Sequence, residues 1–225
     1  MGESVIRKQQ MEQRTRQILN AALELFCEKG IEDTSVEEAA KAAGVGPATI
    51  YRYFETKAEL AISAGIAYWQ KIAEKYVCTL SEEKYIEKNG YCQMHCIFQI
   101  FIRIFEEEFK FLKFLQEFDI FVRRYNIPKE RLTEYEECIL NLKPYVTDAL
   151  EKGLKDGSLD FPYTVEEVYF SIMHTLLSLM QKLSYNGYIL SSDERIELVL
   201  QVRITGNLLL KGLAGKNNTE NGGTL

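Results

Sequence analysis

The sequence has few of the residues on which enzyme active sites and metal centres are usually built. Its 225 residues include two histidines, one tryptophan and four prolines. It contains no Gly-rich phosphate loop, no Gly-x-Ser-x-Gly nucleophile motif and no paired His-Glu metal motif. These familiar kinds of catalysis are therefore excluded, although 33 acidic residues leave an all-helical enzyme with carboxylate chemistry as an alternative.

Long apolar runs are also missing. No apolar stretch approaches 18 residues and no cleavable apolar leader is present, so we expect a soluble cytoplasmic protein with no membrane segment. The five cysteines are an odd number without the spacing of a disulfide framework, which favours reduced thiols. With 46 % hydrophobic residues, the chain can bury a sizeable core in one or two domains.

The sequence also lacks an excess of positive charge. The formal net charge is −6, and residues 1–60 hold eight Lys and Arg against ten Asp and Glu, a balance of −2. A uniformly basic domain is thus excluded, but a local patch still attracts phosphates within a Debye length of about 10 Å. Basic residues gather at Arg7, Lys8, Arg14, Arg16, Arg52 and Lys57.

Residues 44–60, GVGPATIYRYFETKAEL, are typical of a short recognition helix followed directly by another helix. Pro47 suits the first helical position because it has no N–H to leave unpaired. Ile50 and Phe54 are four residues apart and form an inward edge. The outward positions offer hydroxyls and a guanidinium to phosphates and base edges. They are Thr49, Tyr51, Arg52 and Tyr53.

The preceding residues complete a helix-turn-helix. Ser35 and Glu38 form a capping box, and Gly44 lies where a helix ends in a left-handed residue. A glycine-bearing turn then connects the two helices at a steep angle. An earlier helix carries apolar residues at helical spacing, namely Ile18, Leu19, Ala22, Leu25 and Phe26. Three helices therefore share one small core in a domain spanning residues 1–56.

These residues resemble the DNA-binding domain of the tetracycline-repressor (TetR) family of bacterial transcription regulators. The resemblance lies in residues 18–26, Gly30, residues 40–45 and residues 50–60, about a quarter of the chain. It implies a homodimer that binds a palindromic double-stranded DNA operator as a repressor and is released by a small molecule. The DNA-binding residues that we assign are Thr34, Ser35, Gly46, Pro47, Ala48, Thr49, Tyr51, Arg52, Tyr53 and Lys57.

The sequence departs from the family pattern at three positions. Gly46 stands where Ser is frequent, and Pro47 and Ala48 stand where Lys and Gly are common, so one hydroxyl and one cationic phosphate contact are missing. A helix-turn-helix protein with an architectural or assembly role on DNA would show the same DNA face. A ligand cavity would separate it from a ligand-responsive regulator.

Residues 57–213 predict a larger all-helical domain for effector binding and dimerisation, followed by a disordered tail at 214–225. Further capping boxes begin at Thr56, Thr164 and Ser191, and we expect Pro144 to start a kink or a new turn. The expected helices lie near 57–78, 91–106, 108–124, 128–155, 165–186 and 193–213.

The second domain has an unusual aromatic stretch between residues 98 and 121, whose phenylalanines follow helical spacing. Most of them fit a hydrophobic core, and a subset can line an apolar pocket with a few polar groups. The effector-binding residues that we predict are Trp69, His95, Phe98, Phe118, Tyr145 and His174. This lining favours an apolar or aromatic small molecule.

The last two helices carry long apolar stripes. Two such helices from each of two subunits make a four-helix interface, although the same stripes can instead pack inside one subunit. The predicted dimer contacts are Ile172, Leu176, Leu179, Leu183, Leu200, Ile204 and Leu208.

Cys92, His95 and Cys96 share one helical face, where they could bind a soft metal or sense an oxidant. Their spacing is not that of a zinc knuckle, and a fourth ligand would have to come from Cys78, Cys138 or His174. We therefore expect no resident metal and no cofactor.

Overall fold

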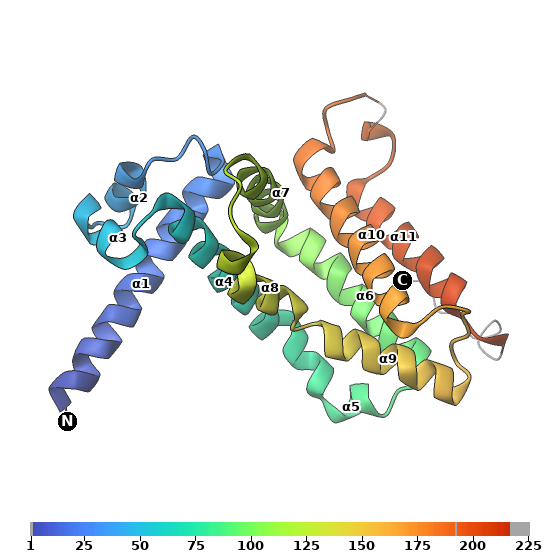
Figure 1. Cartoon of the computed structure of the whole chain (residues 1–225). Helices are drawn as coiled ribbons and strands as arrows, with labels where there is room; N and C mark the ends of the chain where they lie inside the picture. Colours follow the sequence, from blue (N-terminus) through green and yellow to red (C-terminus); the bar gives the residue numbers. More distant parts are fainter. Residues whose placement is uncertain (1, 192, 217–225) are drawn as a thin grey trace. The chain divides into compact units, whose positions relative to one another are not determined.

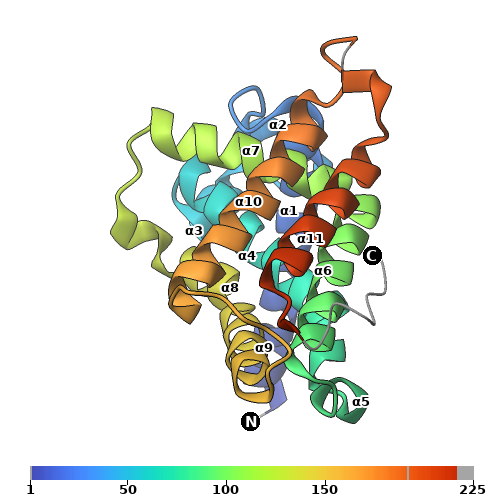
Figure 2. The same ribbon diagram turned by 90° about the vertical axis from the view of Figure 1, so that its right-hand side faces the viewer.

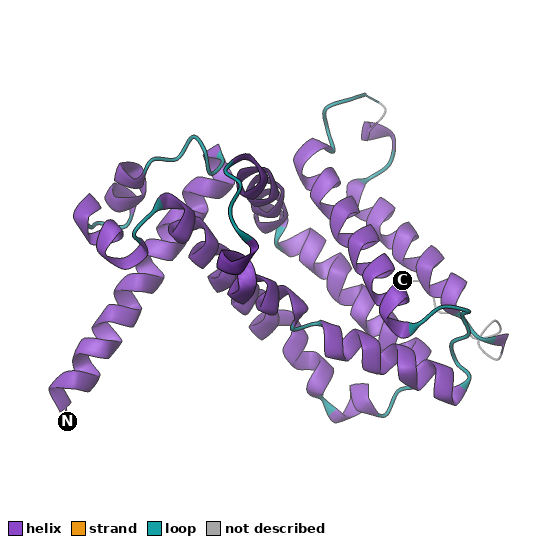
Figure 3. Cartoon of the chain, in the orientation of Figure 1, coloured by secondary structure: helices purple, strands orange, loops and turns teal. Residues whose placement is uncertain are grey.

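The computed structural model describes residues 2–191 and 193–216 and consists of helices joined by short loops (Figures 1 and 3). Within these residues there is no β-strand, only an isolated bridge between Leu159 and Ala214. The predicted all-α fold, with an N-terminal helix-turn-helix and a larger helical domain, is confirmed. Ser192 of one expected capping box and most of the expected tail, residues 217–225, lie outside the described residues.

The chain forms two compact units, and each is made of two stretches of sequence. The first unit contains Met1–Gln70 and Lys113–Ile139, and the second contains Lys71–Leu112 and Leu140–Leu225. The sequence instead suggested a division after residue 56. The helix α4 (Lys57–Tyr76) begins directly after residue 56 and crosses the boundary after Gln70 without interruption.

The first unit is built around α1 (Gly2–Lys29), α2 (Val36–Ala42) and α3 (Pro47–Phe54). It also contains the start of α4, most of α7 (Phe109–Arg124), the 3₁₀ helix η2 (Lys129–Leu132) and α8 (Thr133–Leu140). Its core includes Ile18, Ala22, Phe26, Ala39, Ala40, Ile50 and Phe54, all at most 6 % exposed. The helical periodicity of these apolar residues explains why the three N-terminal helices pack together.

Residues of α7 and the following loop pack against this N-terminal core. The ring of Phe114 stacks on Phe26 with centroids 6.4 Å apart. The loop after α1 is held by Glu32, whose carboxylate pairs with Arg124 and accepts a 3.0 Å hydrogen bond from the Tyr125 hydroxyl. The sequence pattern did not reveal this part of the first unit, because its contacts join residues about 90 positions apart.

The second unit is a helical bundle. It contains η1 (Val77–Ser81), α5 (Glu83–Ile86), α6 (Gly90–Glu107), α9 (Lys143–Asp156), α10 (Val165–Asn186), η3 (Asp193–Arg195) and α11 (Leu198–Leu213). The helix α6 packs against α9 and α11, and α10 packs against the same two helices (Figure 2). Tyr169, Phe98 and Met94 are among its fully buried side chains.

The start of α6 is fixed to the end of α9 by polar contacts. Asn89 caps α6 by accepting a 2.8 Å hydrogen bond from the Cys92 amide. Two further free amides at this helix start donate to side chains at the end of α9, Gly90 to Asp156 and Tyr91 to Ser158, each at 3.0 Å. These bonds satisfy donors that have no partner within the helix.

The predicted bounds of two helices were wrong. The expected helix 128–155 is two helices, α8 and α9, with Pro144 in the first turn of α9. Proline is favourable there because the first helical amides have no partner within the helix, whereas in a helix interior it would break a hydrogen bond. The last helix begins at Leu198 and not at 193, because residues 193–195 form a separate 3₁₀ turn.

Candidate nucleic-acid interface

The helix α3 has one buried and one exposed face. Gly46 caps it in an extended conformation, Pro47 lies in its first turn, and Ile50 and Phe54 are 1 % and 6 % exposed. On the other face Tyr51 is 47 % exposed and Arg52 is exposed, while Thr49 and Tyr53 are half-buried. Ala48 is exposed beside them. The four polar side chains assigned from the sequence therefore occupy the accessible side of α3.

The turn before α3 has the geometry of a helix-turn-helix. Ser35 and Glu38 form the expected capping box, with the Ser35 hydroxyl accepting a 3.1 Å hydrogen bond from the Glu38 amide. A hydrogen bond from the Lys29 ammonium, followed by one from the Ser35 amide, lowers the pKa of Glu38 to about 2. Gly44 adopts φ +64°, a conformation that strongly favours glycine. The capping box thus fixes the start of α2, and Gly44 forms the turn between α2 and α3.

Two assigned DNA-binding residues have other partners in the structure. The Thr34 side chain is 1 % exposed, and its hydroxyl donates a 2.8 Å hydrogen bond to the Gly30 carbonyl, so it does not reach the accessible face. Lys57 is half-buried and donates a 2.7 Å hydrogen bond to the Glu32 carbonyl. Burial lowers the pKa of the Lys57 ammonium. Both side chains hold the loop between α1 and α2.

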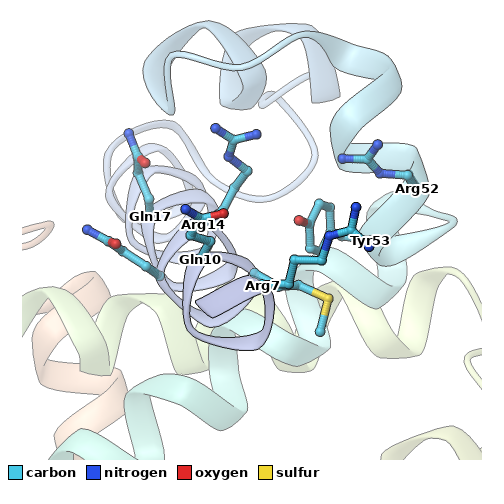
Figure 4. Close-up of a pocket in the computed structure, with 8 residues that line it drawn as sticks. Arg7, Gln10, Arg14, Gln17, Arg52 and Tyr53 are labelled. Atoms are coloured by element: carbon cyan, nitrogen blue, oxygen red, sulfur yellow. The ribbon is translucent and has the colours of Figure 1, made fainter. Parts of the chain in front are cut away.

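A groove of about 1050 Å³ lies between α1 and α3 (Figure 4). Arg14 and Arg52 extend into it from these two helices, and Tyr53 lies on the α3 side. The Arg52 guanidinium lies 5.4 Å from the centre of the Tyr53 ring. Among the side chains that the structure describes, no Asp or Glu lines the groove. Its described lining residues are Arg7, Gln10, Met11, Gln13, Arg14, Gln17, Arg52 and Tyr53.

Comparison with known proteins identifies this domain. The family model for bacterial regulatory proteins of the tetR family matches residues 18–64, which include α2 and α3. The N-terminal domain thus matches the TetR family. The resemblance seen in the sequence is thereby confirmed.

Curated relatives match the chain over short stretches. The HTH-type transcriptional regulator AcrR of Shigella flexneri is 43 % identical over 53 residues, which are 24 % of this chain and 25 % of that protein. The fatty acid metabolism regulator protein of Bacillus subtilis is 45 % identical over 47 residues, 21 % of this chain and 24 % of that protein. The matched part of the chain thus spans about a quarter of the length of these relatives.

Solved structures with the same fold cover most of the chain. A TetR-family regulator from Mesorhizobium loti has a TM-score of 0.66 and 18 % identity, covering 90 % of this chain and 98 % of the other. FadR from Bacillus subtilis, in complex with stearoyl-CoA, has a TM-score of 0.64 and 20 % identity, covering 88 % and 98 %. At these identities the likeness establishes the TetR-type fold alone.

The six assigned effector residues of this TetR-type chain belong to different units. Trp69 and Phe118 lie in the first unit. There the centroids of the Phe118 and Tyr135 rings are 4.6 Å apart. The other four lie in the second unit, and Phe98 is fully buried in its core. The Tyr145 hydroxyl is 3.3 Å from that of Ser81.

The two assigned histidines have different surroundings within the second unit. His174 is exposed, with its ring 5.8 Å from that of Phe170. His95 is half-buried, and burial lowers its pKa. The Tyr145 side chain also lines a pocket of about 310 Å³ with Ala73, Val77, Cys78 and Asn141, which the sequence did not reveal.

The assigned dimer residues divide according to burial. Ile172, Leu176 and Leu183 of α10 are at most 3 % exposed within the second unit, and Leu179 is half-buried. On α11, three residues remain accessible: Leu200, Ile204 and Leu208 are 42 %, 44 % and 67 % exposed. Part of the stripe on α10 thus packs inside the chain, while α11 presents an apolar face.

The sulfur and imidazole groups of α6 do not form a metal site with other described residues. Cys92 is exposed, whereas His95 and Cys96 are half-buried. Among the side chains that the structure describes, no group of three His, Cys, Asp or Glu residues is arranged to hold a metal ion. No helix in the described part of the chain is both long enough and apolar enough to cross a membrane.

Proposed function

We propose that the protein is a DNA-binding transcriptional regulator that reads base pairs with α3. The observation that carries this proposal is the exposed polar face of α3 opposite its buried apolar edge. A helix of this size fits the major groove of B-DNA, where hydroxyls and guanidinium groups recognise base edges. The curated relatives of the N-terminal domain are named as regulators, which favours a binding protein over an enzyme.

Selection of bound fragments from random duplex DNA tests this proposal. We expect the purified protein to enrich a palindrome whose half-sites are about 34 to 36 Å apart, or a multiple of this distance, as two recognition helices on a dyad require. Thr49→Ala and Tyr51→Phe should each reduce discrimination against altered base pairs by about 5- to 150-fold. Tyr163→Phe is the matched control, because Tyr163 is 66 % exposed in the second unit. Unchanged specificity in both α3 variants would refute the assignment of α3.

We infer that the protein acts as a homodimer through α11 and the adjoining part of α10. The support is the apolar face of Leu200, Ile204 and Leu208, which remains 42 % to 67 % exposed within the described chain. Exposed apolar residues arranged along one helix are frequently covered by a second subunit. A two-fold axis would also explain why such a regulator needs a palindromic site.

We further infer that a small apolar molecule releases the protein from DNA, so that it acts as a cytoplasmic repressor. FadR from Bacillus subtilis was solved with stearoyl-CoA, a ligand with a long apolar acyl chain, and has the same fold. The helix α4 follows α3 directly and continues to Tyr76, so it is one unbroken connection by which a ligand-induced tilt reaches α3. A coupling of about 1 to 3 kcal/mol would weaken operator binding 5- to 150-fold.

Fluorescence of Trp69, the single tryptophan, reports binding of probe molecules that carry a long apolar chain, such as fatty acids and long-chain acyl-CoA. Operator affinity is measured in the same samples. Binding that leaves operator affinity unchanged would contradict the release mechanism, because a ligand with equal affinity for both states shifts no equilibrium. The protein would then fit the architectural alternative.

A further inference from the structure

The described side chains in the first half of α1 do not contribute to a hydrophobic core. Residues 6–17 are exposed except for the half-buried Thr15, and the first buried residue is Ile18. Roughly three helical turns therefore precede the first core contact. An isolated polar helix of this length is marginally stable in water, so such an extension is typically stabilised by a partner.

One face of this extension carries alternating guanidinium and amide groups. Arg7, Gln10, Arg14 and Gln17 follow one another at spacings of three, four and three, which places them along one side of the helix. All four line the groove that faces α3 (Figure 4). Gln17 also donates a 3.0 Å hydrogen bond to the Ala43 carbonyl, which ties α1 to the turn before α3.

The arginines of the groove have no carboxylate partner among the described side chains. None of Arg7, Arg14 and Arg52 forms an ion pair within the described part of the chain, although the protein has a net charge of −6. Glu12, two residues before Arg14, pairs instead with Lys8 at 4.0 Å. Three like charges around one groove repel each other, and an anion between them would relieve this repulsion.

We propose that this groove binds the sugar-phosphate backbone of duplex DNA beside the base pairs that α3 reads. This inference rests on the proposed function. Arg7 and Arg14 are seven residues apart, about 10 Å along the helix axis. One DNA strand carries a phosphate about every 3.4 Å along the duplex axis, so the arginine pair spans about three phosphates.

The chemistry of the groove matches a nucleic-acid backbone better than a small anion. Its volume of about 1050 Å³ far exceeds that of a single phosphate, and it is open towards solvent. Guanidinium groups bind phosphate oxygens with two hydrogen bonds, and glutamine amides and the tyrosine hydroxyl donate to phosphate and sugar oxygens. The extension of α1 therefore supplies affinity for DNA, whereas α3 supplies sequence discrimination.

The test uses the full-length variant Arg7→Gln/Arg14→Gln. Its affinities for the selected operator and for an unrelated duplex are measured between 50 and 200 mM salt. We expect both affinities to fall by the same factor, roughly tenfold or more at 100 mM salt. The slope of log affinity against log salt should fall by about 1.8 per half-site, since each lost phosphate contact removes about 0.9.

Two further variants separate the groove from general charge. Arg16→Gln removes an exposed arginine of α1 that does not line the groove, so it should change the slope by less than half as much. Arg7→Lys/Arg14→Lys retains both charges and should restore the slope while recovering only part of the affinity. Circular dichroism of each variant verifies that the helical content is unchanged.

Three results would overturn the proposal. The first is that Arg7→Gln/Arg14→Gln changes the salt slope no more than Arg16→Gln does. The second is that the double variant loses sequence specificity while its affinity for DNA is unchanged, which would mean that the groove reads bases. In both cases the effect of Tyr51→Phe on specificity would still support α3 as the reading element. If the unaltered protein binds no duplex, the proposed function fails and the groove proposal fails with it.

Discussion

Replacing Gly90 by alanine should weaken the packing of α6 against α9. Gly90 is the first residue of α6, and a Cβ built there would lie 2.6 Å from the Ala149 carbonyl oxygen and closer still to the backbone of Gly153. Backbone atoms cannot rotate away as a side chain can, so the two helices must separate. Overpacking of this kind costs about 1 to 3 kcal/mol.

Two other glycines of the second unit give a graded comparison. At Gly153 the added Cβ would lie 2.4 Å from Cγ and 2.8 Å from Cβ of the buried Leu159, so Gly153→Ala should also destabilise the protein. At Gly212 of α11 nothing lies within 4 Å. Gly212→Ala should therefore stabilise the protein by up to about 1 kcal/mol, because alanine favours the helix.

Thermal unfolding followed by circular dichroism measures the three variants. For a chain of this length, 1 kcal/mol corresponds to about 2 to 4 °C in Tm, so Gly90→Ala should lower Tm by about 2 to 12 °C. Gly212→Ala should raise Tm or leave it unchanged. A Gly90→Ala protein that melts with or above the parent would refute the close approach of α6 and α9.

Three further predictions concern the helix-turn-helix and the subunit interface. The Lys29 contact holds the pKa of Glu38 at about 2, below its ordinary 4.5. The ionised Glu38 carboxylate therefore stabilises the fold fully above pH 4.5, and this stabilisation disappears as the pH falls towards 2. Lys29→Met should reduce this acid dependence in thermal melts. Gly44→Ala should destabilise the protein by about 1 to 2 kcal/mol in urea titrations through backbone strain alone, since its Cβ meets nothing. Leu208→Asp should give a folded monomer in light scattering, and a folded dimer would remove α11 from the interface.

The helix-turn-helix was predictable from the sequence because its signals are local. The capping box at Ser35, the left-handed Gly44 and the proline in the first turn of α3 each act within a few residues. The apolar pair Ile50 and Phe54 then fixes which face of α3 is buried. The same periodicity predicts that the hydroxyls and the guanidinium lie on the opposite face of α3.

The long-range partners of these residues could not be predicted in the same way. Thr34 and Lys57 have the side-chain chemistry and the sequence position of DNA-contacting residues. In the structure, however, both donate hydrogen bonds to carbonyl groups of the loop after α1. Periodicity likewise showed apolar stripes on α10 and α11 but not their partners. Only the packing showed that Leu176 is buried inside the chain while Leu208 is exposed.

The sequence by itself determined the helical class and the reading helix, because caps, glycines and helical spacing depend on neighbours along the chain. Tertiary structure decided where charge and apolar surface gather. The charge balance of residues 1–60 gave no sign of a basic site, since it counts every residue equally. The fold brings Arg7 and Arg14 of α1 to the same groove as Arg52 of α3, and charge acts over the distance between side chains and not over their separation in sequence.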